Sequence, residues 1–178
     1  MNRCYHKALL RFCLLGVLSV SSSVFAQTCL SNIEPTTPSA EFESISDNQV
    51  KHLRTGLVWM RCAIGQTYDG TQCSGDAQQM TWEQALQLAH GYRFDDTQGW
   101  RLPNIKELAT LTERSCVRPA INTDVFPNTP PDDFWTSTPA VTDAERAWVV
   151  AYFNSSNSIK DKQRFVFVRL VRTALADE

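Results

Sequence analysis

The most informative stretch of this sequence is Trp100-Arg101-Leu102-Pro103-Asn104-Ile105-Lys106-Glu107-Leu108. Its first residues are predicted to be extended, because a residue that precedes proline is disfavoured in a helix. Asn104 is a favourable N-cap, and Glu107 three residues later can complete a capping box, so a helix is predicted to begin here. Leu108 and Leu111 continue its apolar side, and the helix is predicted to be over by Ser115. The stretch therefore predicts an extended segment that leads directly into a helix.

A second capping box marks an earlier helix. The Thr81 hydroxyl can accept from the backbone N–H of Gln84, and the Gln84 side chain can reach back. Apolar residues then recur at i, i+3, i+4 and i+7 and predict one buried helix face: Trp82, Ala85, Leu86 and Ala89. Gly91 is predicted to end this helix.

Strand-like segments precede the two helices. Residues 42–45 and 49–53 flank a turn at 47–48 and predict a short hairpin. The apolar run at 57–60 is short enough to predict a buried strand.

More strand-like segments follow the helices. Residues 117–133 read as a long proline-rich loop, and such loops are usually functional or held by their own packing. Strands are predicted at 134–137, 147–153 and 164–172, with a polar turn at 154–161. Strands, two helices and further strands predict an α+β fold with a mainly antiparallel sheet.

The first residues predict an exported protein. Arg3, Lys7 and Arg11 give a positive start without acidic residues, and a short apolar run follows at 12–20. Small residues up to Ala26 suit a signal peptidase, so cleavage is expected after Ala26. The apolar run is too short to cross a membrane, which needs about 20 residues, and no later stretch is long and apolar enough. We therefore expect a signal peptide at 1–26, no membrane span after its removal, and a periplasmic or secreted product.

Removal of the signal leaves an acidic chain of a size that fits one domain. The signal holds three of the 17 Lys and Arg and none of the 19 Asp and Glu, so 14 basic residues face 19 acidic ones and the net charge is −5. Such a chain lacks the basic field of nonspecific nucleic-acid binders, and could bind an anionic polysaccharide only through a local basic cluster. We expect an extended N-terminal segment at 27–41, one domain at 42–173 and a tail at 174–178.

Four cysteines stay in the exported chain: Cys29, Cys62, Cys73 and Cys116. An even number in an oxidising compartment predicts two disulfides, for which three pairings exist. Cys62 and Cys73 bracket a loop rich in Gly, Thr, Gln and Asp, so we pair them locally, which leaves Cys29 with Cys116. The second bridge would tie the N-terminal segment to the domain. No Cys-x-x-Cys pair occurs, and we expect no metal and no cofactor.

An ordered set of segments runs through the chain: Arg54-Thr55-Gly56-Leu57-Val58-Trp59, Thr81-Trp82-Glu83-Gln84-Ala85-Leu86, the stretch at 100–108, Phe134-Trp135-Thr136-Ser137-Thr138 and Val168-Arg169-Leu170-Val171-Arg172. The set is similar to the Lcl C-terminal domain family, exported bacterial domains named after the C-terminal domain of a collagen-like adhesin. The resemblance covers roughly residues 42–173. Most members of the family have no assigned function, and the adhesin that names it binds sulfated polysaccharide.

The stretch at 100–108 also resembles a segment of formylglycine-generating-enzyme-like proteins, which have a C-type-lectin-like fold. This resemblance implies two helices flanking sheets whose terminal strands lie side by side, with a long irregular loop region between. The enzyme activity is not implied, because those enzymes act through cysteines late in the domain and no cysteine follows Cys116. The calcium and sugar motifs of C-type lectins, Glu-Pro-Asn, Gln-Pro-Asp and Trp-Asn-Asp, do not occur in this chain either.

Several residues are candidates for ligand contact. Trp135 follows the proline-rich loop and could stack on a sugar, whereas the other four tryptophans are expected in the core. Asp132 and Asp133 could offer oxygens to calcium, or could be a solvated loop pair. Arg169 and Arg172 are candidates for anion recognition, because the planar guanidinium suits sulfate and carboxylate; alternatively they form the exposed face of a strand.

Nothing in the sequence proposes catalysis. Arg101 is expected to be a structural tie, to Glu107 or to a loop carbonyl. His52 and His90 are isolated, and neither Gly-x-Ser-x-Gly nor His-Glu-x-x-His occurs. We therefore expect no catalytic residue and a binding or interaction domain. Adhesion to polysaccharide or another surface ligand is the first hypothesis, a protein-interaction or structural role in an envelope or pilus assembly is the second, and an enzyme is the third.

Overall fold

The computed structural model describes residues 27–94 and 96–175. The predicted signal peptide at 1–26 and the end of the predicted tail, 176–178, lie outside these residues. In chain order the elements are β1 (Thr28–Cys29), a 3-10 turn (Ser39–Glu41), β2 (Phe42–Ser46), β3 (Gln49–His52), β4 (Leu57–Met60), β5 (Thr67–Tyr68), β6 (Cys73–Ser74), β7 (Gln79–Met80), α1 (Trp82–Ala89), α2 (Ile105–Ala109), β8 (Cys116–Val117), β9 (Asp133–Pro139), β10 (Arg146–Ala151), β11 (Ser156–Asp161), β12 (Val166–Phe167) and β13 (Val171–Thr173).

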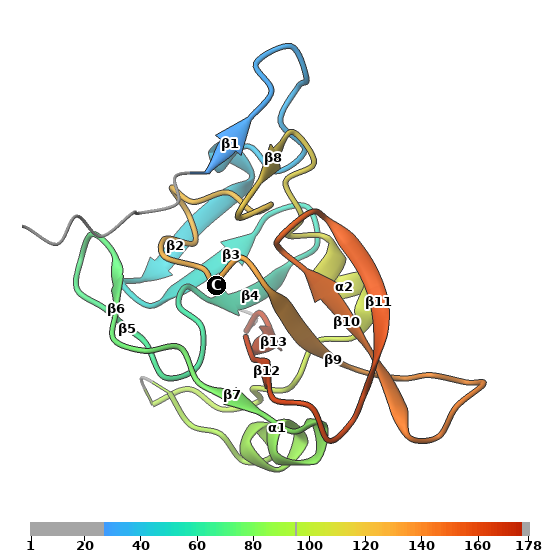
Figure 1. The fold of residues 1–178 in the computed structure, drawn as a ribbon. Coiled ribbons are helices and arrows are strands. Elements are labelled where there is room, and N and C mark those ends of the chain that lie inside the picture. Colours follow the sequence, from blue (N-terminus) through green and yellow to red (C-terminus); the bar gives the residue numbers. More distant parts are fainter. Residues whose placement is uncertain (1–26, 95, 176–178) are drawn as a thin grey trace, which may run out of the picture.

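Two larger sheets form the body of the molecule. One has the order β13-β4-β3-β2 and is antiparallel throughout. The other has the order β11-β10-β9-β12-β7, in which only β9 and β12 run parallel. Two small sheets pair β1 with β8 and β5 with β6. Figure 1 places β1 and β8 at one end of the body and α1 at the other. The mostly antiparallel sheets with two helices agree with the predicted α+β class.

Both helices begin at the predicted capping boxes. The Thr81 hydroxyl accepts from the N–H of Gln84 at 3.3 Å, and the Gln84 side chain accepts from the N–H of Thr81 at 2.9 Å. Asn104 and Glu107 exchange the equivalent bonds at 2.9 and 2.8 Å. α2 ends at Ala109, before the predicted limit at Ser115, so Leu111 lies beyond the helix. None of the helices in the described ranges is long and apolar enough to cross a membrane.

The central strands are buried on both faces. Val58 and Met60 of β4 pack in one cluster with residues of α1, whereas Trp59 between them packs in a second cluster with Leu108 of α2. Adjacent residues of β9 and β10 divide between the two clusters in the same way: Phe134 and Trp135, Val149 and Val150. Burial on both faces explains why these strands read as continuous apolar runs in the sequence.

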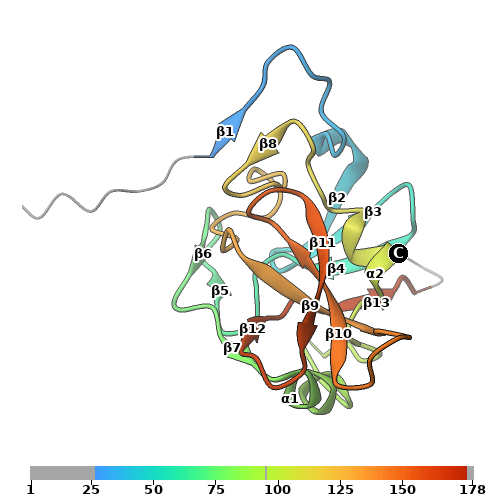
Figure 2. The same ribbon diagram turned by 45° about the vertical axis from the view of Figure 1, so that its right-hand side comes forward.

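The C-terminal part differs from the sequence prediction in two places. The polar segment 154–161, predicted as a turn, contains β11, which pairs with β10 at the edge of its sheet. An edge strand has a neighbour on one side only and tolerates polar residues. The segment 164–172, predicted as one strand, is divided into β12 and β13, which belong to different sheets (Figure 2). The chain passes from one sheet to the other here, and residues 168–172 are buried.

Candidate binding groove

A disulfide and a short strand pair fix the start of the N-terminal arm, which we define as residues 27–41. Cys29 is bonded to Cys116, and Cys62 to Cys73, the pairing that the sequence favoured. Cys29 and Cys116 are also register partners in the β1–β8 pair. The N–H of Leu30 donates to the carbonyl of Ser115 at 2.8 Å. The arm therefore lies against the loop that follows α2.

Glu113, on that loop, holds the middle of the arm. Its carboxylate accepts from the backbone N–H of Thr36 at 3.0 Å and from the N–H and hydroxyl of Thr37 at 2.9 and 3.0 Å. It also accepts from the N–H and hydroxyl of Ser115 at 2.9 and 2.6 Å. Only 4% of Glu113 is exposed. Burial by itself raises the pKa of this carboxyl, but the hydrogen bonds from Ser115, Thr36 and Thr37 outweigh it and lower the pKa to about 2.

Two amide side chains hold the ends of the arm. Gln27 donates to the carbonyls of Pro119 and Ile121 at 2.6 and 2.7 Å. At the other end, Asn122 donates to the carbonyl of Thr37 at 2.8 Å and to the hydroxyl of Ser39 at 3.0 Å. These contacts join the arm to the 113–124 loop along the length of the arm. The surface between the arm and the loop is therefore preorganised.

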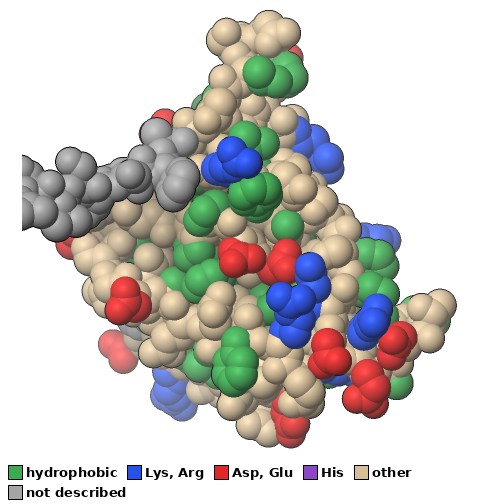
Figure 3. Space-filling model, viewed as in Figure 1, with side chains coloured by type: hydrophobic (Ala, Val, Ile, Leu, Met, Phe, Trp, Pro, Cys, Tyr) green, Lys and Arg blue, Asp and Glu red, His purple; other side chains and the backbone are tan. Residues whose placement is uncertain are grey.

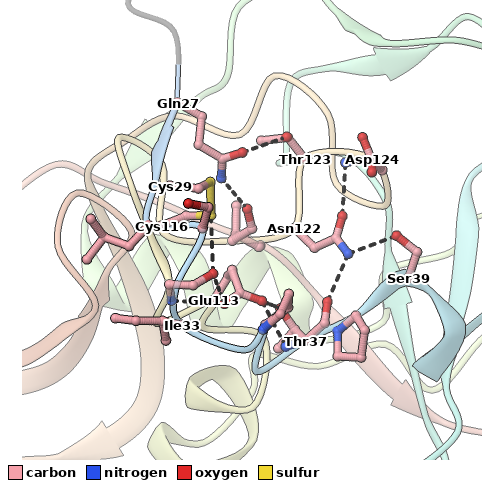
Figure 4. Close-up of a pocket in the computed structure, with 16 residues that line it drawn as sticks. Gln27, Cys29, Ile33, Thr37, Ser39, Glu113, Cys116, Asn122, Thr123 and Asp124 are labelled. Carbon is pink, nitrogen blue, oxygen red and sulfur yellow. Dashed lines mark hydrogen bonds between the residues drawn. A yellow bond between two sulfur atoms is a disulfide. The ribbon is translucent and has the colours of Figure 1, made fainter.

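A groove of about 460 Å³ runs between the arm and the 113–124 loop. Figure 4 shows Ile33, Thr37 and Ser39 on the arm side, with Glu113 and Asn122 on the loop side. Apolar side chains of the arm contribute to it and stay accessible, since Leu30 is 56% and Ile33 40% exposed. A concave surface with apolar walls and a few polar groups is typical of binding sites.

The charge of the groove is negative. Glu113 and Asp124 line it, and among the residues 27–94 and 96–175 no Lys, Arg or His lines it. Arg114 and Arg118 are exposed near it in sequence but do not line it. On the face shown in Figure 3, acidic and basic side chains are interspersed. The groove itself therefore offers no cation to a sulfate or a carboxylate.

A second hollow, of about 490 Å³, lies between α1 and the start of α2. Arg101 lines it and donates both guanidinium ends to Glu107, each at 2.7 Å. Because Glu107 also closes the capping box of α2, Arg101 is a structural tie, as the sequence predicted. This pairing raises the pKa of Arg101, chiefly through the hydrogen bonds to Glu107.

Three predicted ligand-contacting residues are buried, which corrects the expectation for them. Trp135 is 0% exposed and donates its indole N–H to the carbonyl of Met80 at 2.9 Å. Arg169 is 0% exposed, and Arg172 is 1% exposed. Side chains without solvent access cannot stack on a sugar or bind a sulfate at the surface.

The two buried arginines join segments of the core. Arg169 donates to the carbonyls of Met60 and Arg61 and, at 2.8 Å, to the hydroxyl of Thr129. Arg172 donates to the side-chain oxygen of Gln49 at 2.7 Å. The alternating sequence pattern suggested an exposed strand face because it contained no sign that the chain passes between two sheets at this point.

Asp132 and Asp133 lie together but do not face the groove. Asp132 accepts from the N–H of Asp133 at 2.7 Å, and the Asp133 carboxylate pairs with Lys160 at 3.1 Å. Asp124, their neighbour in sequence, lines the groove instead. In the part of the chain that the structure describes, no group of three or more His, Cys, Asp and Glu side chains could hold a metal ion.

The structure also contains a polar cluster around His52, which the sequence alone predicts to be isolated. The His52 ring lies 3.5 Å from the Glu41 carboxylate and 3.1 Å from the Thr55 hydroxyl. His52 is 2% exposed and stacks on Phe42, and burial lowers its pKa more than Glu41 raises it. None of the cluster's residues lines the groove or the second hollow. The geometry therefore indicates a role in holding the arm to the β2–β3 hairpin.

Comparison with protein families gives one clear result. The model of the Lcl C-terminal domain matches residues 48–172, more than half of the chain. Comparisons with curated proteins and with solved structures gave no match. The 113–124 loop lies inside the matched residues, whereas the arm lies outside them, so the groove combines the family domain with a segment beyond the match. On this match, the chain belongs to the Lcl C-terminal domain family.

Proposed function

We propose that this chain is an exported, non-catalytic binding domain that takes its partner in the groove beside the N-terminal arm. Two disulfides support an extracytoplasmic location, periplasmic or secreted, because such bonds persist in oxidising compartments. The positive, apolar and small residues at 1–26 support export by a cleaved signal.

A C-type-lectin-like fold is part of this proposal. β13, near the end of the domain, pairs with β4 in the sheet that also contains β2 and β3. The terminal strands β2 and β13 thus lie in one sheet, but at its opposite edges and not side by side as the resemblance implied; two helices and the irregular 118–132 segment lie between them in sequence. The shared sheet, the two helices and the irregular segment support the fold that the resemblance of the 100–108 stretch implies, whereas the separation of β2 from β13 does not.

The observation that carries the binding role is the state of the polar groups in the groove. The Glu113 carboxylate already accepts five hydrogen bonds of 3.0 Å or less, and these bonds lower its pKa to about 2. A general acid or base needs a pKa near the working pH and a free position for the proton. Glu113 has neither, so the groove is better suited to holding a partner than to transforming one.

The partner that fits the groove is a protein segment with apolar and basic side chains. Leu30 and Ile33 offer apolar surface, and the charges of Glu113 and Asp124 attract cations. Sulfated polysaccharide, which the adhesin that names the family binds, would meet this negative charge without a basic partner. The interaction hypothesis is therefore favoured over adhesion to an anionic polysaccharide, and both are favoured over an enzyme.

Site-specific photo-cross-linking in the producing cells tests this proposal. A photoreactive residue at Ser31, which lines the groove, is expected to yield one defined protein adduct, and the adduct is expected to disappear when Ile33→Asp is added. The matched control is the same photoreactive residue at Asn157, an exposed position of β11 outside the groove. Equal labelling at both positions would reject the groove as the site. Salt-sensitive retention on immobilised sulfated polysaccharide, abolished by changes in the groove, would favour adhesion instead.

A further inference from the structure

The residue that follows the predicted cleavage site is a glutamine, a residue that can cyclise when it is N-terminal. Cleavage after Ala26, which belongs to the proposed export, would make Gln27 the N-terminal residue. An N-terminal glutamine can cyclise: its α-amine attacks Cδ of its own side chain, a new amide bond forms, the Cδ–Nε2 bond breaks and ammonia leaves. The product is a five-membered lactam without an α-amine and without Nε2.

Hydrogen bonds in the structure restrain the side-chain amide of Gln27, the group that this reaction would consume. Nε2 of Gln27 donates to the carbonyl oxygens of Pro119 and Ile121 at 2.6 and 2.7 Å. Oε1 accepts from the hydroxyl of Thr123 at 3.0 Å. Figure 4 shows the Gln27 side chain directed at the 113–124 loop, with bonds drawn to Thr123 and toward the loop backbone. All three partners belong to the loop that forms the far wall of the groove.

Ring closure would break this arrangement. Both hydrogen bonds donated by Nε2 are lost when that nitrogen leaves as ammonia, and Cδ must come within bonding distance of the α-amine while the side chain is held by the loop. The adjacent Cys29–Cys116 disulfide keeps the chain two residues further on bonded to the same loop.

We propose that the folded domain keeps Gln27 as an open-chain amide after signal removal, and that this side chain is the first anchor of the arm. Cyclisation is confined to chains whose arm has been released. The mature terminus is thus a structural part of the binding groove, and cleavage one residue later, which would make Thr28 the terminus, would leave the groove without this anchor.

The test follows the loss of ammonia from the N-terminal peptide of the exported protein by mass spectrometry over time. Two samples are compared, the native protein and the same protein reduced and denatured. Cyclisation is expected to be at least about tenfold slower in the native protein, since both hydrogen bonds donated by Nε2 must be given up first; tenfold corresponds to about 1.4 kcal/mol.

Two variants separate the anchor from general stability. Thr123→Val removes the hydroxyl that donates to Oε1 and is expected to speed native cyclisation. Ser31→Ala, in the same groove but at a residue that is not among the hydrogen-bond partners described for the Gln27 side chain, is expected to leave the rate unchanged. Equal rates in native and denatured protein would overturn the inference alone. A terminus other than Gln27 would overturn the proposed cleavage and, with it, this inference.

Discussion

At the level of single residues, Glu113 joins the N-terminal arm to the loop after α2 through one buried carboxylate. Thr36 donates a hydrogen bond to Glu113 although it lies 77 residues away, so the sequence alone does not indicate that the two residues meet. Trp135, Arg169 and Arg172 were predicted to contact a ligand but are buried, because their burial depends on how distant strands pack. Arg101 was judged correctly, since its partner Glu107 is only six residues away.

Removing the charge of Glu113 is predicted to destabilise the domain in a pH-dependent way. The usual pKa of 4.5 is lowered to about 2 on folding, so ionised Glu113 contributes its full stability above pH 4.5 and loses it as the pH falls toward 2. Glu113→Gln is expected to lower the free energy of unfolding by about 2–3 kcal/mol at neutral pH. Urea unfolding across this pH range measures the difference.

The difference between Glu113→Gln and the unaltered protein should shrink as the pH falls through the 4.5-to-2 window. Asp124→Asn is the matched control, because it removes an exposed carboxylate of the same groove that accepts none of these bonds. A constant difference at all pH values would show that shape, rather than charge, makes Glu113 important.

At the level of elements, local signals predicted well. Both helix starts and the β2–β3 hairpin follow from short-range patterns and appear at the expected residues. The sequence did not predict β11, because its polar residues resemble a turn and its strand conformation comes from pairing with β10. The division of 164–172 between two sheets could not be predicted either, since an alternating pattern of side chains does not tell which sheet each residue joins.

Loss of the α2 cap is predicted to cost about 1 kcal/mol. Asn104→Ala removes the oxygen that accepts from the N–H of Glu107, and it leaves that N–H without its partner. The thermal midpoint and urea midpoint should both fall. Asn157→Ala, at an exposed position of β11, should leave them nearly unchanged. Similar losses in the two variants would argue against a capping role.

Two glycines with similar backbone angles provide a sharper comparison. Gly65 and Gly70 have φ of +94° and +100°, so alanine is strained at both. A Cβ at Gly65 would lie 2.6 Å from the carbonyl oxygen of Asp76, whereas a Cβ at Gly70 meets nothing within 4 Å. Gly65→Ala is therefore expected to cost about 1–3 kcal/mol more than Gly70→Ala in chemical unfolding. Equal losses of stability in the two variants would show that the positive φ alone, and not the close contact at Gly65, causes the destabilisation.

At the scale of the whole molecule, the two disulfides differ in exposure. Cys62 and Cys73 are 5% and 3% exposed, whereas Cys29 is exposed. A mild reductant is expected to open Cys29–Cys116 first, because exchange requires access to a sulfur atom. Alkylation followed by peptide mapping should then label Cys29 and Cys116 while Cys62–Cys73 stays closed.

Opening that bridge should release the arm. The expected result is faster proteolysis within residues 30–36 and a loss of about 2–5 kcal/mol of stability. The body of the domain, with both core clusters intact, should keep its fold. Simultaneous reduction of both disulfides, or an arm that stays protected after reduction, would contradict the view that Cys29–Cys116 holds it.

The most direct test of an exported domain with a cross-linked arm is peptide mapping, without reduction, of the protein recovered from its native cells. The predicted result is an N-terminus at Gln27 in the extracytoplasmic fraction, with one linked peptide pair for Cys29 and Cys116 and another for Cys62 and Cys73. Four free thiols, or an intact Met1 terminus in the cytosol, would contradict it.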